Sequence, residues 1–111
     1  MNINELLSRY INEIKKIYGE TLQTVILFGS YARGDNTEDS DIDIMILANK
    51  TDMQLKQFQN QLADMTFDFN LDYDTDIEPI VKSNEFFNKW VEEYPFYSNI
   101  KKEGVILFEA A

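Results

Sequence analysis

The sequence predicts a small α/β fold in which helices pack against a mixed β-sheet, as a single domain over residues 1–111. Three observations predict this fold class. Helical and strand-like apolar patterns alternate along the chain, an apolar content of 44% is enough for one core of ordinary size, and 111 residues leave little room for a second domain. The expected order is helix, strand, loop, strand, helix, strand, helix.

The first half of the chain predicts one helix and two strands. Apolar residues recur at helical spacing over residues 3–18, and Gly19 suits a helix stop. Residues 22–28 form an apolar run that predicts a buried strand leading into a glycine. A polar, turn-rich loop over residues 34–40 then precedes a second predicted strand, residues 42–47, which has an acidic start.

A second helix and a third strand follow. Thr51 and Gln54 have the spacing of a capping box, and apolar residues continue at helical spacing to about residue 72. Residues 75–81 suit a strand, and Pro79 within it predicts an edge position or a bulge, because proline cannot donate to a neighbouring strand.

The last third predicts mainly helix. Ser83 or Asn84 is expected to cap a helix through Trp90, and a short helical turn then runs to Gly104, before an apolar tail at residues 105–108. In the helix after Ser83, an inward stripe and two exposed residues are expected. The stripe comprises Phe86, Trp90 and Tyr94, and the residues expected to be exposed are Phe87 and Tyr97.

Composition excludes several functional classes. The net charge is −10, with ten basic against twenty acidic residues, which makes a nucleic-acid groove improbable and disfavours an anionic membrane surface. The chain has no Cys and no His, which excludes zinc sites built from those residues, thiol catalysis and Ser-His-Asp triads. Any metal must have oxygen ligands, which favours Mg²⁺, Mn²⁺ or Ca²⁺. No apolar run approaches the ~20 residues of a membrane span, and no signal peptide is recognisable, so a cytoplasmic location is expected.

The first candidate feature is the pair Gly29-Ser30. A strand ends there, a glycine permits a tight turn, and a small hydroxyl residue stands at an expected helix start, where free N–H groups favour an anion. Taken alone, this pair is a weak signal and is more typical of an ordinary turn.

The second candidate feature is the pair Asp41 and Asp43. On a strand these residues point to the same face, with Cα atoms roughly 6.6 Å apart, so their carboxylates can converge on a cation. Ile42, Ile44 and Ile46 are expected to face the core, which turns the acids away from it. The plain alternative is two solvated acids, but two like charges side by side repel, and a bound cation explains why they are tolerated.

Together, the two features form a longer motif. It reads Gly-Ser-Tyr-Ala-Arg-Gly at residues 29–34, then five further residues, then Ser-Asp-Ile-Asp at residues 40–43. This motif resembles the signature of the DNA polymerase β-like nucleotidyltransferases, and in particular that of the minimal nucleotidyltransferases of bacteria and archaea. The resemblance implies that Gly29 and Ser30 hold the triphosphate of ATP or another nucleoside triphosphate. It also implies that Asp41 and Asp43 bind Mg²⁺ or Mn²⁺.

Arg33 has two interpretations under this resemblance. It either reaches a phosphate of the nucleotide, or it pairs with Asp39 or Asp41 and holds the loop, and we favour the structural role.

The family usually has a third carboxylate on the next strand, as a metal ligand and general base. Four acids occupy alternate positions and would all point to the same face of a strand, so spacing alone does not select among them. They are Asp72, Asp74, Asp76 and Glu78. We choose Asp76, at the expected start of the strand with Ile77 turned inward. Glu78-Pro79 departs from the family's usual pattern of an acid followed by an aliphatic residue. This departure leaves open that the domain binds its nucleotide with little catalysis.

The resemblance implies two functions. In the first, the domain is an enzyme that moves a nucleoside monophosphate, AMP from ATP by preference, to a hydroxyl and releases pyrophosphate. In the second, it is the antitoxin half of a toxin–antitoxin pair, which binds and masks a HEPN-type ribonuclease. An antibiotic-modifying transferase is less favoured, because such enzymes usually carry a further domain for the acceptor. A protein partner or self-association is expected in either case, with the exposed aromatic residues of the last third as anchors.

Overall fold

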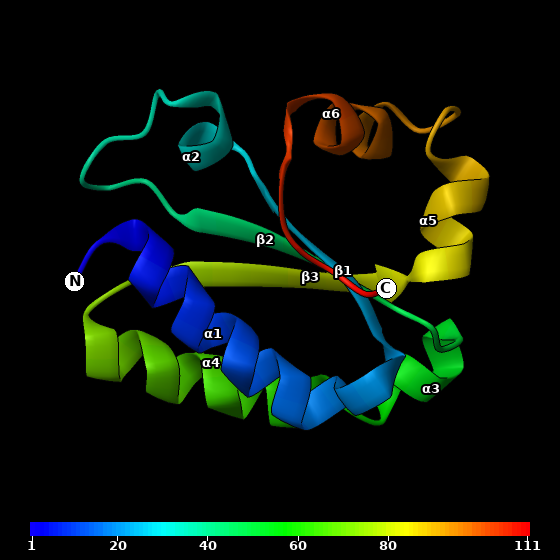
Figure 1. Cartoon of the computed structure of the whole chain (residues 1–111), viewed down its shortest axis with the longest axis horizontal. Coiled ribbons are helices and arrows are strands. Elements are labelled where there is room, and N and C mark those ends of the chain that lie inside the picture. Colours follow the sequence, from blue (N-terminus) through cyan, green and yellow to red (C-terminus); the bar gives the residue numbers. More distant parts are fainter.

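The computed structural model describes residues 1–111 as an α/β sandwich around one mixed sheet. The strand order is β3-β2-β1-β4. β1 (Leu22–Phe28) is antiparallel to both β2 (Ile42–Ala48) and β4 (Val105–Glu109), whereas β3 (Ile77–Ser83) is parallel to β2. Helices α1 and α4 cover one face of the sheet, and α2, α5 and α6 lie over the other (Figure 1). The predicted fold class is confirmed, with one strand more than predicted.

The first helix has the predicted bounds. α1 spans Ile3–Tyr18, the Asn2 side chain accepts a hydrogen bond from its first turn, and Gly19 ends it. A 3₁₀ turn, Gly19–Thr21, leads into β1. The buried face of α1 packs on the isoleucine face of β2, so that Ile42, Ile44 and Ile46 face this core as expected. This packing fixes which face of β2 carries Asp43.

The second predicted helix is interrupted. It divides into α3 (Asp52–Lys56) and α4 (Gln59–Tyr73). The Thr51–Gln54 capping box is present, with hydrogen bonds in both directions. At the break, the N–H groups of residues 57 and 58 bond to carbonyls three residues earlier, which tightens the turn and redirects the chain. The apolar spacing continues across the break because both helices face the same core.

The third strand begins two residues later than predicted. β3 is an edge strand, so the edge position inferred from Pro79 is confirmed. The Asn70 side chain accepts from the Ile77 N–H at 2.9 Å and donates to the Ile77 carbonyl at 3.1 Å. These two bonds tie the end of α4 to the start of β3. They thereby fix where the acidic residues on either side of Ile77 lie at the edge of the sheet.

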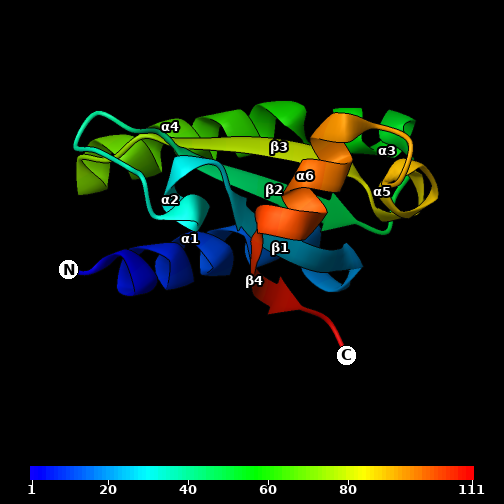
Figure 2. The ribbon, with the colours of Figure 1, turned by 90° about the horizontal axis from the view of Figure 1, so that it is seen from above.

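The last third forms α5 (Asn84–Trp90), α6 (Pro95–Glu103) and β4. Ser83 caps α5 as predicted. The short turn expected before Gly104 is the nine-residue α6, and the expected apolar tail is strand β4, which lies at the lower edge of the sheet in Figure 2.

The expected orientation of the aromatic residues is confirmed for Phe86 and Trp90, which are partly buried against the core, and is wrong for the other three. Phe87 and Tyr97 are buried, at 4% and 7% exposed, whereas Tyr94 of the expected inward stripe is 44% exposed. The reason is a second apolar face of the sheet, where Met45 and Leu47 must be covered by α5 and α6.

None of the helices combines the length and apolar content needed to cross a membrane.

Candidate functional site

The two halves of the motif meet because β1 and β2 are antiparallel neighbours. The last residue of β1, Phe28, lies opposite Asp43. The Gly29-Ser30 turn, which follows Phe28, therefore adjoins the start of β2, although twelve residues of chain separate Ser30 from Asp43. The sheet register brings the predicted phosphate-binding turn and the predicted metal-binding strand together.

Gly29 is required at this turn for two reasons. Its φ of 73° and ψ of −154° are strained for residues with a side chain. A Cβ at this position would also collide with the Asp43 carboxylate. The Gly29 carbonyl accepts hydrogen bonds from the N–H groups of Ala32 and Arg33, each at 3.1 Å. Those bonds form the single turn of α2 (Ser30–Arg33) and leave the N–H groups that precede them at the open end of the turn.

Three carboxylates converge at the starts of β2 and β3. Asp41, Asp76 and Glu78 each offer an oxygen within 4.8 Å of the others. The parallel register explains this proximity, since Ile42 is paired with Ile77 and the two aspartates directly precede these residues. We call Asp41, Asp76 and Glu78 the acidic cluster.

The remaining acids fall into two groups. Asp43 pairs across the strands with Glu78, which places it beside the acidic cluster. Asp74, one of the alternatives for the third carboxylate, ends α4 in a left-handed conformation and is exposed outside the cluster. Asp72 lies on α4, beside a different hollow. Of these alternatives, the structure brings Asp76 and Glu78 close to Asp41, and the choice of Asp76 as the third metal ligand stays a prediction.

The electrostatics of these acids reflect their crowding. A hydrogen bond with Asp41 raises the pKa of Asp76, and the negative charge of Asp41 raises the pKa of Glu78. Partial burial, followed by the charge of Asp41, raises the pKa of Asp43, and Arg33 opposes this shift. All three acids therefore hold protons more tightly than isolated carboxylates do, which is the condition that a bound cation relieves.

Arg33 has other partners than those predicted. Its guanidinium forms ion pairs with Asp35 at 3.3 Å and with Glu103 of α6 at 3.7 Å, rather than with Asp39 or Asp41. The first pair holds the start of the loop, and the second links α2 to α6. The structural role is thus present with different partners, and Arg33 remains beside the turn where a phosphate is expected.

A hollow of about 390 Å³ adjoins this turn. It lies between the end of β1, α2 and α6, and both Ser30 and Asp43 line it. Four α6 residues that lie outside the motif line it as well: Phe96, Asn99, Ile100 and Glu103. No motif marks them, and only the packing of α6 beside α2 brings them to the site.

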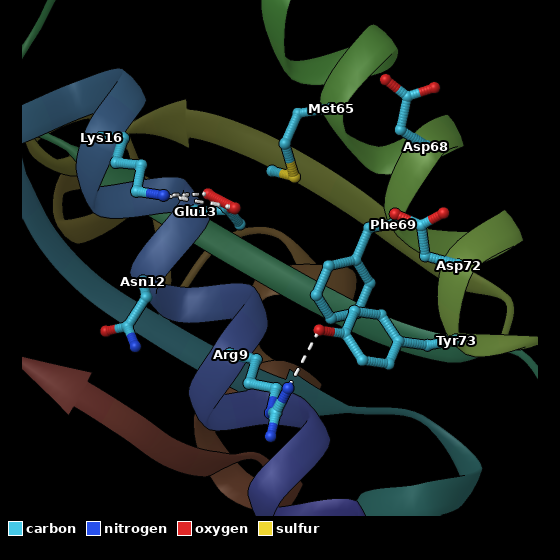
Figure 3. Close-up of a pocket in the computed structure, with 9 residues that line it drawn as sticks. All are labelled: Arg9, Asn12, Glu13, Lys16, Met65, Asp68, Phe69, Asp72 and Tyr73. Carbon is cyan, nitrogen blue, oxygen red and sulfur yellow. Dashed lines mark hydrogen bonds and ion pairs between the residues drawn. The ribbon is translucent and has the colours of Figure 1, made fainter.

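A larger hollow of about 530 Å³ lies elsewhere, between α1 and α4 (Figure 3). Its charged residues have partners close by. Lys16 pairs with Glu13 at 3.0 Å, and Arg9 donates to the Tyr73 hydroxyl at 3.2 Å. It holds no residue of the motif, so the candidate site is the smaller hollow with the acidic cluster beside it.

The donor set fits a hard divalent cation. Carboxylate oxygens are the only strong ligands at the starts of β2 and β3, and Mg²⁺ and Mn²⁺ prefer such ligands together with phosphate oxygens. A glycine turn with open N–H groups beside an oxygen-ligand cation site is an arrangement for a polyphosphate and its metal ion.

The mixed sheet, the glycine turn and the paired aspartates define a nucleotidyltransferase. The chain belongs to the nucleotidyltransferase domain family, which it matches over residues 7–107. It is 37% identical over 116 aligned positions to MJ0604 of Methanocaldococcus jannaschii, a proposed protein adenylyltransferase, and the alignment covers 97% of this chain and 100% of the relative.

Solved structures share the fold. A chain of a toxin–antitoxin complex with AMP-PNP has a TM-score of 0.62 at 19% identity, over 98% of this chain and 75% of that chain. A chain of the Shewanella oneidensis complex between a tri-AMPylated HEPN toxin and an MNT antitoxin has a TM-score of 0.54 at 18% identity, over 97% of this chain and 74% of that chain. At these identities the likeness concerns the fold.

Proposed function

We propose that this domain transfers AMP from ATP to a hydroxyl group on a partner protein, with Mg²⁺ or Mn²⁺ as the metal ion. The observation that carries the proposal is the contact between the Gly29 turn and Asp43, beside the acidic cluster. The choice of AMP and of a protein acceptor is supported by the description of the relative as a protein adenylyltransferase and by the AMP-PNP in a structure of the same fold.

In this proposal the turn and the acids have separate tasks. Gly29 and Ser30 hold the β- and γ-phosphates through N–H groups and the Ser30 hydroxyl, and Arg33 adds positive charge beside them. Asp41, Asp43 and Asp76 hold the metal ion. The bound metal ion neutralises charge on the phosphates in the transition state. The residues thereby fix the α-phosphate in line with the incoming hydroxyl.

The reaction breaks one bond and forms one bond. The acceptor oxygen bonds to the α-phosphorus of ATP, and the bond from that phosphorus to the bridging oxygen breaks, releasing pyrophosphate. The proton of the acceptor hydroxyl passes to a carboxylate, for which we propose Asp76, with Glu78 beside it.

A protein partner is the second element of the proposal. Phe67 and Leu71 lie one turn apart on α4 and are 65% and 68% exposed, which is a high exposure for large apolar residues. Asp64 and Asp68 flank them on the same helix, so this surface suits a partner with basic residues around an apolar contact. The complexes of the same fold favour a HEPN-type protein as the partner. A cytoplasmic location stays a prediction.

A catalytically weak antitoxin that only masks such a partner is the alternative function. The sequence favoured it through the altered Glu78-Pro79 pattern. The convergence of Asp76 and Glu78 with Asp41 favours transfer instead, because a third acid is available whichever of the two is used.

Labelled ATP distinguishes these functions. The protein is incubated with Mg²⁺, ATP labelled at the α-phosphate and a lysate of the native host, and we expect label on one specific protein. ATP labelled at the γ-phosphate should give none, and the variant with Asp41→Asn and Asp43→Asn should be inactive. Binding to a HEPN-type protein without transfer of label would support masking alone. A lone 13.0 kDa monomer, purified at its native level without a co-eluting protein, would contradict the partner.

A further inference from the structure

We propose that the hollow between the Gly29 turn and α6 is the subsite for the adenine base of the nucleotide, with Phe96 as its stacking residue and Asn99 as its specificity residue. This inference rests on the proposed function and names how the base is selected. The hollow has a volume of about 390 Å³, which lies in the range of small-ligand sites.

The position of the hollow suits the nucleoside part of the ligand. Gly29, Ser30 and Asp43 line it and also belong to the proposed phosphate and metal site. The acidic cluster lies on the β3 side of Asp43, whereas α6 lies on the β1 side. A nucleotide whose phosphates lie at the Gly29 turn therefore has one sheltered direction for its base, toward α6.

Phe96 supplies an aromatic surface at this place. It is 49% exposed, although it is a large apolar residue near the N-terminus of α6. Its ring meets that of Phe28 nearly at a right angle, with centroids 5.8 Å apart, so Phe28 fixes its orientation. Ile100 lines the same hollow and completes an apolar wall. An oriented and half-exposed ring beside a phosphate-binding turn suits stacking on a base.

Asn99 supplies the polar contact that a stacked base needs. It follows Phe96 by three residues on α6, so both side chains lie on one side of the helix, and both line the hollow. A carboxamide both donates and accepts, and adenine presents an acceptor, N7, beside a donor, the N6 amino group. Guanine presents two acceptors on that edge, which a carboxamide matches less well. The pair Phe96 and Asn99 therefore favours adenine.

Glu103 and Arg33 bound the far end of this subsite. Their ion pair, at 3.7 Å, joins α6 to α2 across the hollow. Because Glu103 is engaged by Arg33, its charge is offset where the ribose or the phosphates would lie. The pair also fixes the distance between the helix that would hold the base and the turn that would hold the phosphates.

Calorimetry with Mg-ATP and Mg-GTP tests the subsite. We expect Phe96→Ala to weaken ATP binding by roughly five- to 150-fold, which corresponds to the 1–3 kcal/mol lost when a stacking aromatic residue is removed. Phe96→Tyr should restore most of the affinity. Asn99→Leu should reduce the preference for ATP over GTP by about tenfold or more. The matched control is Tyr94→Ala, which removes an exposed aromatic residue that does not line the hollow, and it should bind ATP as the parent does.

Electron paramagnetic resonance of Mn²⁺ binding, measured without nucleotide, separates a failure of the base subsite from a failure of the proposed metal site. The Phe96 and Asn99 variants should bind Mn²⁺ as the parent does, because neither residue belongs to the acidic cluster. If Phe96→Ala binds ATP with unchanged affinity, or if Tyr94→Ala weakens it equally, the base lies elsewhere and the proposed function stands. If the parent protein binds no Mg-nucleotide, the proposed function itself fails, and the subsite fails with it.

Discussion

Replacing Glu78 with glutamine tests whether the acidic cluster is held together against its own repulsion. In the absence of metal, Glu78 faces the charges of Asp41 and Asp76, each within 4.8 Å. The variant removes both repulsions and keeps the shape of the side chain. We therefore expect Glu78→Gln to be more stable than the parent without metal, and to gain less stability from Mg²⁺ than the parent does, because less repulsion remains for the cation to relieve.

The size of the effect follows from the distances. Two unit charges 4.8 Å apart in water repel by about 0.9 kcal/mol, and physiological salt reduces this by about half. Because the cluster lies at the surface, the water value applies, and two repulsions amount to about 1 kcal/mol. A change of this size raises the melting temperature of a domain near this length by roughly 4–6 °C. In the parent protein, Mg²⁺ at ten times its Kd should contribute about 1.4 kcal/mol of stability.

Thermal unfolding at pH 7.5, with EDTA or with Mg²⁺, measures both effects. The matched control is Asp64→Asn on the outer side of α4, which removes one charge from the same net total but from outside the cluster. The control should shift the melting temperature little and keep the Mg²⁺ response. A less stable Glu78→Gln protein in EDTA would refute the reasoning, as would an equal gain in the control, because the repulsion would then not be local.

Three further predictions concern the Gly29 turn, the pH dependence of the acids and the cap of α5. Gly29→Ala should destabilise the protein by about 1–2 kcal/mol in urea unfolding, since the turn needs a positive φ. It should also abolish Mg-ATP binding, because the added methyl group displaces Asp43. Unchanged binding would contradict the contact between Gly29 and Asp43. The raised pKa values of Asp43, Asp76 and Glu78 mean that the folded protein holds these protons more tightly than the unfolded chain, so their contribution to stability is present at low pH and is lost as the pH rises through the folded values. Mg²⁺ should accordingly bind more weakly at pH 5 than at pH 7 in calorimetry, and equal affinities would show that the acids are not the ligands. Ser83→Ala should cost about 1 kcal/mol in urea unfolding through the lost cap of α5, and should leave Mg-ATP affinity unchanged.

Local patterns predicted the elements whose determinants are local. The bounds of α1 and β1 follow from apolar periodicity and from a glycine at the end of each, and the cap of α5 follows from Ser83. Pro79 indicated an edge strand because proline lacks the N–H that an inner strand needs. In each case the residue that decides the structure lies within the element.

Features that depend on distant contacts were not predictable in the same way. The strand β4 is a short apolar run whose partner, β1, lies about eighty residues earlier in the chain. The burial of Phe87 and Tyr97 follows from a sheet that is apolar on both faces, whereas the pattern of the isoleucines indicates only one. The break between α3 and α4 leaves the apolar spacing intact, so periodicity gives no sign of it.

The site itself divides along the same line. Gly29, Ser30, Asp41 and Asp43 could be predicted as site residues because they lie in one short motif of the sequence. Which of the acids near Ile77 come close to Asp41 depends on the register between β3 and β2. Four acids at alternate positions of the sequence do not reveal that register. No local pattern marks Phe96 and Asn99 as lining the hollow, because only the packing of α6 beside α2 brings them there.

The antiparallel register that sets Phe28 opposite Asp43 has a practical consequence for protein engineering. The sheet, rather than the connecting loop, aligns the two halves of the site, and residues 34–39 of that loop are exposed. Lengthening such a loop costs little, with only about 0.6 kcal/mol for each doubling of its length. The bond between Asn36 and Thr37 is therefore a permissive insertion point, where a fluorescent reporter or an affinity tag can sit beside the site and leave its alignment intact.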